Sequence, residues 1–321
     1  MSRVLVLIPS YNHAPYIEER IESVLRQSFA DIDVRVIDDC STDDTMQRLS
    51  RYGDKRMTVQ RREKNTGSPF FAWQSALELL EHAGHEYIWI AESDDVAHER
   101  LLERAVNRLD AEPGAAVYYC HSWSIDERSL IVGHSINYLK RHFAEVNWER
   151  AFTMPGESFR RVCLVKGMAI PNMSSAVMRA SKFAAAFDPK LVSFRLAGDW
   201  AFAGRLAAAG DVIFDCWDGN SFRRHARTSR QQCPMHKLLF EYYYAVHSAY
   251  GDNPALSAEF EASFNNVTNM FLHERPALSD FLSYGMAISP AVTLKAMSFI
   301  VRQKASRAEP VTELFEPREA S

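Results

Sequence analysis

Acidic residues gather at two points of the chain, each directly after a run of apolar residues. Asp38-Asp39 follows Val34–Ile37, and Glu92-Ser-Asp94-Asp95 follows Tyr87–Ile90. Carboxylates held together repel one another unless a cation neutralises them. Their oxygens suit Mg²⁺ or Mn²⁺, which keep positions open for substrate phosphates. The second cluster is therefore a candidate metal site, and the first a candidate for binding an amide N–H and a ribose hydroxyl. For each cluster alone, a helix cap or a solvated turn explains the residues equally well.

Four further segments carry groups that bind ligands. Ser10-Tyr11-Asn12 follows the first apolar run. Asn65-Thr-Gly67 opens a helix, and its backbone N–H groups suit a phosphate or a sugar hydroxyl, although a plain turn and cap explains this segment nearly as well. Asp199 stands at the start of a helical pattern, where a cap is the plainer reading. Arg223-Arg224-His225 concentrates cationic donors that suit a diphosphate, and His225 is also a metal ligand type; a basic surface loop is the alternative.

The elements that must position these residues alternate between strand and helix up to about residue 120. The predicted strands there are 4–8, 34–37, 57–59, 87–90 and 116–119, and the clearest helices are 68–81 and 99–109; a further short strand is predicted later, at 212–214. Short connections between such elements indicate βαβ units and an open, parallel α/β sheet, in which ligands bind beyond the carboxyl ends of the strands. Three polar clusters fall at such ends: Ser10–Asn12, Asp38-Asp39 and Glu92–Asp95. The chain has neither G-x-G-x-x-G after the first strand nor a P-loop.

Composition limits the class of protein. The 321 residues are 47% hydrophobic and 24% charged, with a formal net charge of −4. This balance is typical of a folded α/β protein and excludes a basic protein that coats nucleic acid. Five cysteines without a C-x-x-C pair indicate a reducing compartment rather than a disulfide framework. No run reaches the ~20 apolar residues of a spanning helix, so we expect a cytoplasmic protein.

The predicted elements become entirely helical after about Arg230. Helices are expected over 237–250, 257–273, 279–287 and 291–304, and a mobile tail over 305–321. Their apolar faces indicate either core packing or a subunit interface. A subunit interface would make the protein a homo-oligomer. Met286–Val301 followed by Arg302, Lys304 and Arg307 leaves a second interpretation open, a peripheral contact with the inner face of a membrane.

Together the motifs resemble the inverting family 2 glycosyltransferases, which have the GT-A fold. The resemblance covers residues 3–230 in the family's order, from Pro9-Ser-Tyr-Asn12 through Asp38-Asp39, Glu92–Asp95 and Gly198-Asp199-Trp200 to Phe222-Arg-Arg-His225. It implies a mixed sheet flanked by helices, with a catalytic domain over 1–230 and a helical C-terminal appendage over 231–304. The departures are Glu92 in place of a frequent Asp, Gly198 in place of Glu, and Ala72-Trp73-Gln74 in place of Ala-Arg-Asn.

The resemblance also implies a role for each matching residue. Asp199 is the general base. A divalent cation, Mn²⁺ or Mg²⁺, is held by Asp94, Asp95 and His225, with Asp95 as the more direct ligand. The nucleotide-sugar contacts fall to Pro9, Ser10, Tyr11, Asn12, Asp38, Asp39, Asn65, Gly67, Asp94 and Arg224. The donor is a nucleoside-diphosphate sugar of the UDP or dTDP type. The acceptor is a glycan or a lipid-linked glycan, as in the synthesis of surface polysaccharides, and no nucleic acid is involved.

Two other classes of protein compete with this reading. Nucleotidyltransferases of related fold also use acidic metal sites, but they carry a Gly-rich loop with a basic residue after the first strand, and Pro9–Pro15 lacks one. A receiver-type binding module also ends a strand in an acidic pair. There the pair ends the first strand, whereas here Asp38-Asp39 ends the second.

Overall fold

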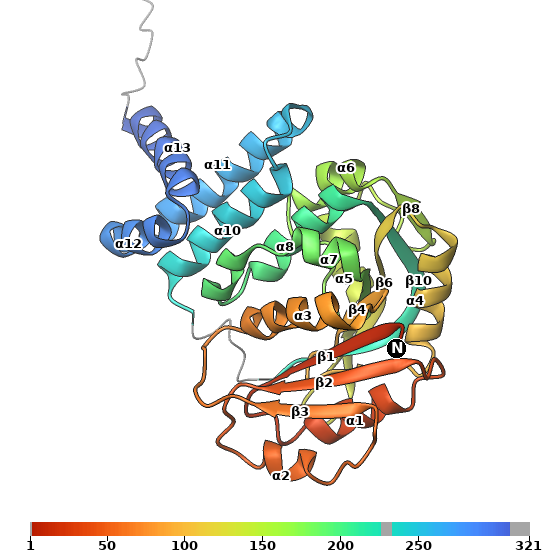
Figure 1. Ribbon diagram of the computed structural model, residues 1–321. Helices are drawn as coiled ribbons and strands as arrows, with labels where there is room; N and C mark the ends of the chain where they lie inside the picture. The colour runs from red at the N-terminus through yellow and green to blue at the C-terminus, as the bar shows by residue number, and fades with distance from the viewer. Residues whose placement is uncertain (1, 226–232, 309–321) are drawn as a thin grey trace, which may run out of the picture.

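The computed structural model describes residues 2–225 and 233–308, and one mixed sheet forms its centre (Figure 1). Among the described residues the strand order is β3-β2-β1-β4-β9-β6-β10-β5, with β7 paired to β6 and β8 paired to β10. The strands are β1 (Val4–Ser10), β2 (Ile32–Asp38), β3 (Met57–Arg61), β4 (Tyr87–Ile90), β5 (Val96–Ala97), β6 (Ala115–Ile125), β7 (Ile131–His134), β8 (Phe152–Met154), β9 (Ala176–Arg179) and β10 (Asp211–Arg223).

The first four strands form the parallel half of the sheet that the alternating pattern predicted. β1 pairs in parallel with β2 and β4, and β2 pairs in parallel with β3. β1 is buried along its whole length, as its continuous apolar run indicated. Its register places Ser10 beside Asp38, so the ends of these two strands meet at one edge.

The second half of the sheet is mixed. β9 lies antiparallel between β4 and β6, while β10 runs parallel to β6. β5 pairs with the far end of β10, through Asn220 and Ala97, and so brings the Glu92–Asp95 segment to that end. The sequence predicted only short pieces of β6 and β10, because polar residues such as Ser122 and Asn220 interrupt the later parts of both strands.

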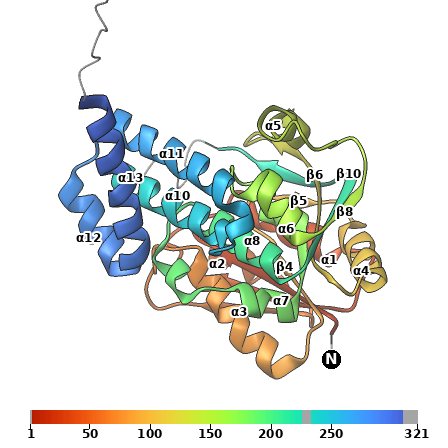
Figure 2. The same cartoon turned by 90° about the horizontal axis from the view of Figure 1, so that it is seen from above.

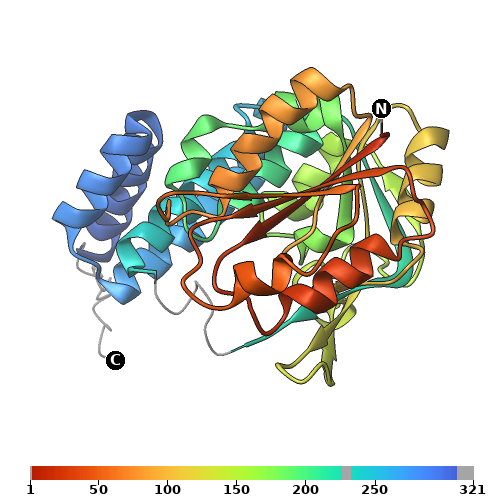
Figure 3. The same ribbon diagram turned by 60° about the horizontal axis from the view of Figure 1, so that its bottom comes forward.

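Helices cover both faces of the sheet, in two hydrophobic clusters. α1 and α4 pack on one face, and α3, α7 and α8 pack on the other (Figures 1 and 3). The helices before residue 225 are α1 (Ile17–Leu25), α2 (Thr45–Leu49), α3 (Phe70–Ala83), α4 (Leu101–Ala111), α5 (Ser135–His142), α6 (Gly156–Phe159), α7 (Ala180–Ala186) and α8 (Gly198–Ala209).

The C-terminal region consists of α10 (Met235–Tyr250), α11 (Ser257–Glu274), α12 (Leu278–Ile288) and α13 (Pro290–Ala308). α10 lies beside α8, while α12 and α13 stand further from the sheet (Figure 2). A Cβ atom added at Gly204 of α8 would lie 2.7 Å from the Cα atom of Ala249, so the two helices touch at backbone level. The hydrophobic cluster on this face runs without a break from the sheet into α10, α11 and α13.

The last helix is longer than the sequence predicted. α13 continues to Ala308, past Lys304 where we expected it to end, and the remainder of the predicted tail, 309–321, lies outside the described residues. Within the described part of the chain, no helix combines the length and the hydropathy that crossing a bilayer requires.

Candidate active site

The loops after β1 and β2 are tied to each other by hydrogen bonds. Asp38 is fully buried and accepts from the backbone N–H of Ser41 at 2.9 Å, so its carboxylate serves the local turn, as the capping interpretation holds. Asn12 has a left-handed backbone, with φ 54°, and its Oδ1 accepts from the N–H of Thr42 at 2.8 Å. Pro9 and Ser10 are buried and Tyr11 is exposed beside them.

Asp39 connects this edge to the segment that contains Asn65 and Gly67. Its two carboxylate oxygens accept from the backbone N–H of Thr66 at 3.0 and 2.9 Å. Gly67 has φ +71°, a conformation that a side chain would strain, and its carbonyl accepts from Arg195. The residues predicted to contact a nucleotide-sugar from 9–12, 38–39 and 65–67 therefore belong to one connected set of loops.

Two buried arginines hold the acidic segment after β4 by hydrogen bonds to its backbone carbonyls. Arg20 donates its Nε–H to the carbonyl of Glu92 at 2.7 Å, and Arg223 donates its Nε–H to the carbonyl of Asp94 at 2.7 Å. Asp95 accepts from the N–H of Arg223 at 2.8 Å and from Asn172 Nδ2 at 2.9 Å. Burial and the charge of Asp94 raise the pKa of Asp95 to about 6. The carboxylate of Asp95 therefore supports the loop.

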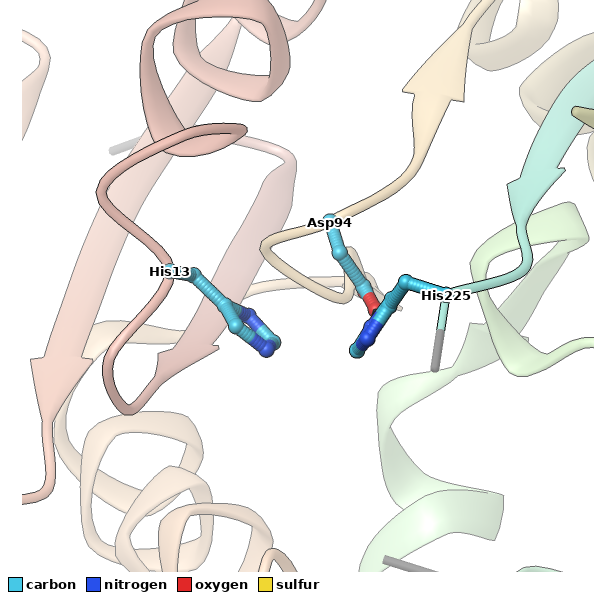
Figure 4. A group of neighbouring side chains, drawn as sticks. All are labelled: His13, Asp94 and His225. Atoms are coloured by element: carbon cyan, nitrogen blue, oxygen red, sulfur yellow. Dashed lines mark hydrogen bonds and ion pairs between the residues drawn. The ribbon is translucent and has the colours of Figure 1, made fainter. Parts of the chain in front are cut away.

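A possible set of metal ligands forms from His13, Asp94 and His225, whose ligand atoms all lie within 4.8 Å of one another (Figure 4). It is the one such group among the described residues, and it contains Asp94 and His225 as predicted, but His13 rather than Asp95. His225 Nε2 lies 3.0 Å from Asp94 Oδ2, and this hydrogen bond raises the pKa of His225. Burial opposes ionisation of Asp94, but the contacts with both histidines lower its pKa below the ordinary value.

His13 was not singled out in the sequence, although a signal for it was present. It follows Tyr11-Asn12 at the carboxyl end of β1, the same edge to which the acidic segment returns. Its Nδ1 lies 2.6 Å from Ser93 Oγ, which fixes the orientation of the ring. The ring of Tyr16 packs beside both histidines, with its centroid 6.2 Å from that of His13 and 5.5 Å from that of His225, and the two histidine centroids are 5.8 Å apart.

An open cavity of about 330 Å³ adjoins the metal-ligand group. It is lined by Arg224, His225 and the turn Asp126–Arg128. Arg224 is exposed, and its backbone N–H donates to the carbonyl of Ile125 at 2.8 Å, which fixes the chain while the side chain stays accessible. Arg128 and Arg224 both line this cavity, and two arginines beside a set of metal ligands suit the phosphate oxygens of a nucleotide.

Asp199 lies in the first turn of α8, where its Oδ1 accepts from the N–H of Trp200 at 2.7 Å. Burial raises the pKa of Glu92 to about 8, and the charges of the neighbouring carboxylates, Asp199 included, add to this shift. Asp199 therefore lies within electrostatic range of the acidic segment. A Cβ atom on Gly198 would stand 2.5 Å from the ring of Phe70, so Phe70 fills the space that a larger residue at 198 would need.

Two of the sequence relatives are named as glycosyltransferases. The family model described as "Glycosyl transferase family 2" matches residues 5–167. The poly(ribitol-phosphate) β-N-acetylglucosaminyltransferase TarS of Staphylococcus aureus is 34% identical over 113 residues, which are 34% of this chain and 19% of TarS. The glycosyltransferase GlyG of Streptococcus pneumoniae is 31% identical over 121 residues, 36% of this chain and 39% of GlyG. The alignments thus span well under half of these relatives.

Solved structures share the fold along nearly the whole chain. Residues 1–349 of S. aureus TarS in complex with UDP superpose with a TM-score of 0.65 at 17% identity, over 96% of this chain and 93% of that one. The mannosyltransferase PcManGT from Pyrobaculum calidifontis, in complex with GDP-Man and Mn²⁺, superposes with a TM-score of 0.53 at 18% identity, over 94% and 88%. The fold is GT-A. Since the family model covers half of the chain, and its edge loops carry the motifs in order, the protein belongs to glycosyl transferase family 2.

Proposed function

We propose that this protein is an inverting, metal-dependent glycosyltransferase that moves a sugar from a UDP-sugar to a hydroxyl of a glycan acceptor. The observation that carries the proposal is the convergence of His13, Asp94 and His225 beside a cavity lined by Arg224. The complexes of TarS with UDP and with UDP-GlcNAc favour a uridine nucleotide among the nucleotides that the sequence left open.

The donor atoms present fit a divalent cation. Two imidazoles and one carboxylate form a softer set than the two carboxylates and one imidazole expected from the sequence, and imidazole suits transition metals better than Mg²⁺. We therefore favour Mn²⁺, which the structure of PcManGT also contains. When bound, the cation neutralises the negative charge that develops on the departing diphosphate. Asp95 and Arg223 hold Asp94 in place, and Ser93 orients His13.

The chain's own residues supply the rest of the chemistry. Asp199 accepts the proton of the acceptor hydroxyl as that oxygen attacks the anomeric carbon of the donor from the face opposite the diphosphate. One displacement then inverts the configuration without a covalent enzyme intermediate. Arg224 lines the diphosphate side, and the loops tied by Asp39 and Thr66 hold the nucleoside side. Holding both substrates in line supplies much of the rate enhancement.

The names of two relatives support a polymeric acceptor. TarS is named for a poly(ribitol-phosphate) acceptor, and another relative, the chondroitin synthase of Escherichia coli, is 28% identical over 138 residues, 42% of this chain and 19% of that enzyme. Both names concern polymers, which supports a role in the synthesis of surface polysaccharide on a glycan or lipid-linked glycan. We place this chemistry in the cytoplasm, where nucleotide-sugars are made, with peripheral membrane contact as a further part of the proposal.

A panel of nucleotides tests the proposal. The purified protein is heated with UDP, UDP-GlcNAc, other UDP-sugars, dTDP-glucose and GDP-mannose, each with Mn²⁺, with Mg²⁺ or with EDTA. We expect the largest rise in melting temperature with a UDP-sugar and Mn²⁺, and its loss in EDTA. A shift that is the same with and without EDTA would contradict metal dependence, and no shift with any nucleotide would contradict the donor class.

A further inference from the structure

Glu241 is a fully buried acid in the middle of α10, far along the chain from every motif of the site. Its carboxylate accepts hydrogen bonds from three consecutive backbone N–H groups. Arg195 N lies 2.8 Å from Oε1, and Leu196 N and Ala197 N lie 2.8 and 2.9 Å from Oε2. The hydroxyl of Tyr284 lies 3.1 Å from Oε1 and 2.8 Å from the carbonyl of Ser193. Three backbone donors thus converge on one side chain, and the Tyr284 hydroxyl shares its single hydrogen between that carboxylate and the carbonyl of Ser193.

The three amides lead directly into the catalytic helix. Ala197 is the residue before α8, and Asp199 is the second residue of that helix. All three amides precede Gly198, the first residue of α8, so they belong to a loop and have no partner in a helix or strand. A loop amide that is buried without an acceptor would cost about 1–3 kcal/mol. Glu241 supplies the acceptor from another element, so the position of Asp199 depends on where α10 lies.

The same loop is held from the opposite side by the segment that we assign to the donor. Ser68 Oγ donates to the carbonyl of Phe194 at 2.8 Å, and the side chain of Arg195 donates to the carbonyl of Gly67. Residues 194–197 therefore lie between the Asn65–Ser68 segment and α10. Without Glu241 the loop would keep its contacts on the donor side and lose those that set the start of α8.

We propose that Glu241 is a positioning residue for the general base, so that the C-terminal helices complete the active site. The proposal rests on the proposed function, because it takes Asp199 as the base. Glu241 does not touch a substrate. It fixes the entry of α8, and Asp199 turns with that entry. Displacement of the base by about 1 Å lowers turnover by up to about a hundredfold while the bound donor is unaffected.

The test is Glu241→Gln, which keeps the volume but offers one acceptor oxygen and two donor hydrogens to the three amides. The probe is the UDP-sugar that gives the largest thermal shift with Mn²⁺, and turnover is the release of UDP with water as acceptor. We expect turnover to fall at least tenfold, with the dissociation constant of the donor unchanged within twofold. Hydrogen exchange at residues 195–197 should become faster. Glu241→Asp, which keeps the charge, should restore part of the turnover.

The matched control is Tyr243→Phe, on the same helix. It removes a buried hydrogen bond of 2.8 Å to Thr268 and leaves the loop before α8 untouched. We expect its turnover and its exchange at 195–197 to match the unaltered protein. Equal turnover in Glu241→Gln and Tyr243→Phe would overturn the proposal.

Two further variants keep the outcome decisive. If Glu241→Gln does not fold, Tyr284→Phe removes one donor to the same carboxylate, and unchanged exchange at 195–197 in that variant would overturn the proposal. Asp199→Asn separates this inference from the proposed function. Normal turnover in Asp199→Asn contradicts the base assignment, whereas normal turnover in Glu241→Gln alone contradicts only the positioning role.

Discussion

The loops at the sheet edge and the C-terminal helices are held in place by different forces. At the edge, backbone groups and charged side chains fix each loop, as where Arg223 reaches both Asp94 and the carbonyl of Asp126. In the helices, aromatic rings pack on one another, with centroids 4.8 Å apart for Tyr243 and Phe264 and 5.0 Å for Phe264 and Phe299. Loops without regular structure need polar contacts to hold one position, whereas helices obtain theirs from packing.

Glu241 is the exception that joins the two regions. Among the residues after 232 whose burial the structure describes, it is the one charged side chain that is buried. Like the side chains at the sheet edge, it fixes a loop through hydrogen bonds to backbone amides, but it does so from within the apolar helices. The comparison therefore predicts that substitutions of accessible residues at the edge change turnover or binding with little loss of stability. Substitutions among the helices should lower stability with little change in turnover. The buried Asp95 at the edge and Glu241 among the helices are the exceptions.

The largest expected effect is on turnover at the edge. Asp199→Asn keeps the shape of the side chain but removes the base, so turnover should fall by roughly 10²–10⁴-fold, a range typical of general-base catalysis. The affinity for the donor should be retained, as measured by calorimetry with the donor and Mn²⁺. Asp252→Asn, an exposed carboxylate of the helical region, is the control and should have normal turnover. Comparable turnover in both variants would remove Asp199 from the role of base.

The next effect is on metal binding. His13→Ala and Asp94→Ala each remove one member of the proposed ligand set, so the affinity for Mn²⁺ in the presence of UDP should fall by roughly 10–100-fold or more. Asp95→Asn removes a carboxylate oxygen that supports the loop, so it should lower the melting temperature. It should lower the Mn²⁺ affinity less than His13→Ala does. Titration of Mn²⁺, followed by its paramagnetic resonance signal, measures the Mn²⁺ affinity of the three variants, and thermal unfolding measures their melting temperatures. If Asp95→Asn lost Mn²⁺ binding and His13→Ala kept it, the ligand set would be the one first predicted from the sequence.

A smaller effect, on stability, tests the helical side of the comparison. Gly204→Ala places a methyl group against the backbone of Ala249, so we expect a loss of about 1–3 kcal/mol, as for other overpacked sites. Gly53→Ala is the matched control, because nothing lies within 4 Å of an added Cβ atom there. Thermal unfolding followed by circular dichroism distinguishes the two variants. Equal melting temperatures would mean that α8 and α10 separate without cost.

The sequence predicted those parts of the molecule that depend on local patterns. The parallel half of the sheet follows from apolar runs and helical spacing, and the strand ends identified the edge that carries Asp94 and His225. The pattern predicted only the first part of β10, because polar residues interrupt the second half of that strand. Asp95 could not be told from Asp94 in the sequence, since only the fold shows which of two adjacent carboxylates meets Arg223 and Asn172.

The contacts that complete the site join residues far apart in the chain. Glu241 meets the loop before α8 from more than forty positions away, and Arg223 meets Glu19 of α1 from 204 positions away. No periodicity or spacing encodes such pairs. A buried charged residue within an apolar helix, such as Glu241 among Phe240 and Tyr243, was the one available signal, because burial of an acid requires compensating donors.

The two arginines at the end of β10 differ in their exposure to solvent. Arg223 is buried and supports the acidic segment, while Arg224 is exposed and lines the cavity. Successive residues of an extended chain face opposite sides, so inserting or deleting one residue between 221 and 223 would exchange the two. The register against β6 already shifts twice between Asp215 and Asn220, and this irregular part of the strand can absorb a change in length. Insertions and deletions acquired in evolution should therefore accumulate between 215 and 220 and be rare in the residues from 221 to 225.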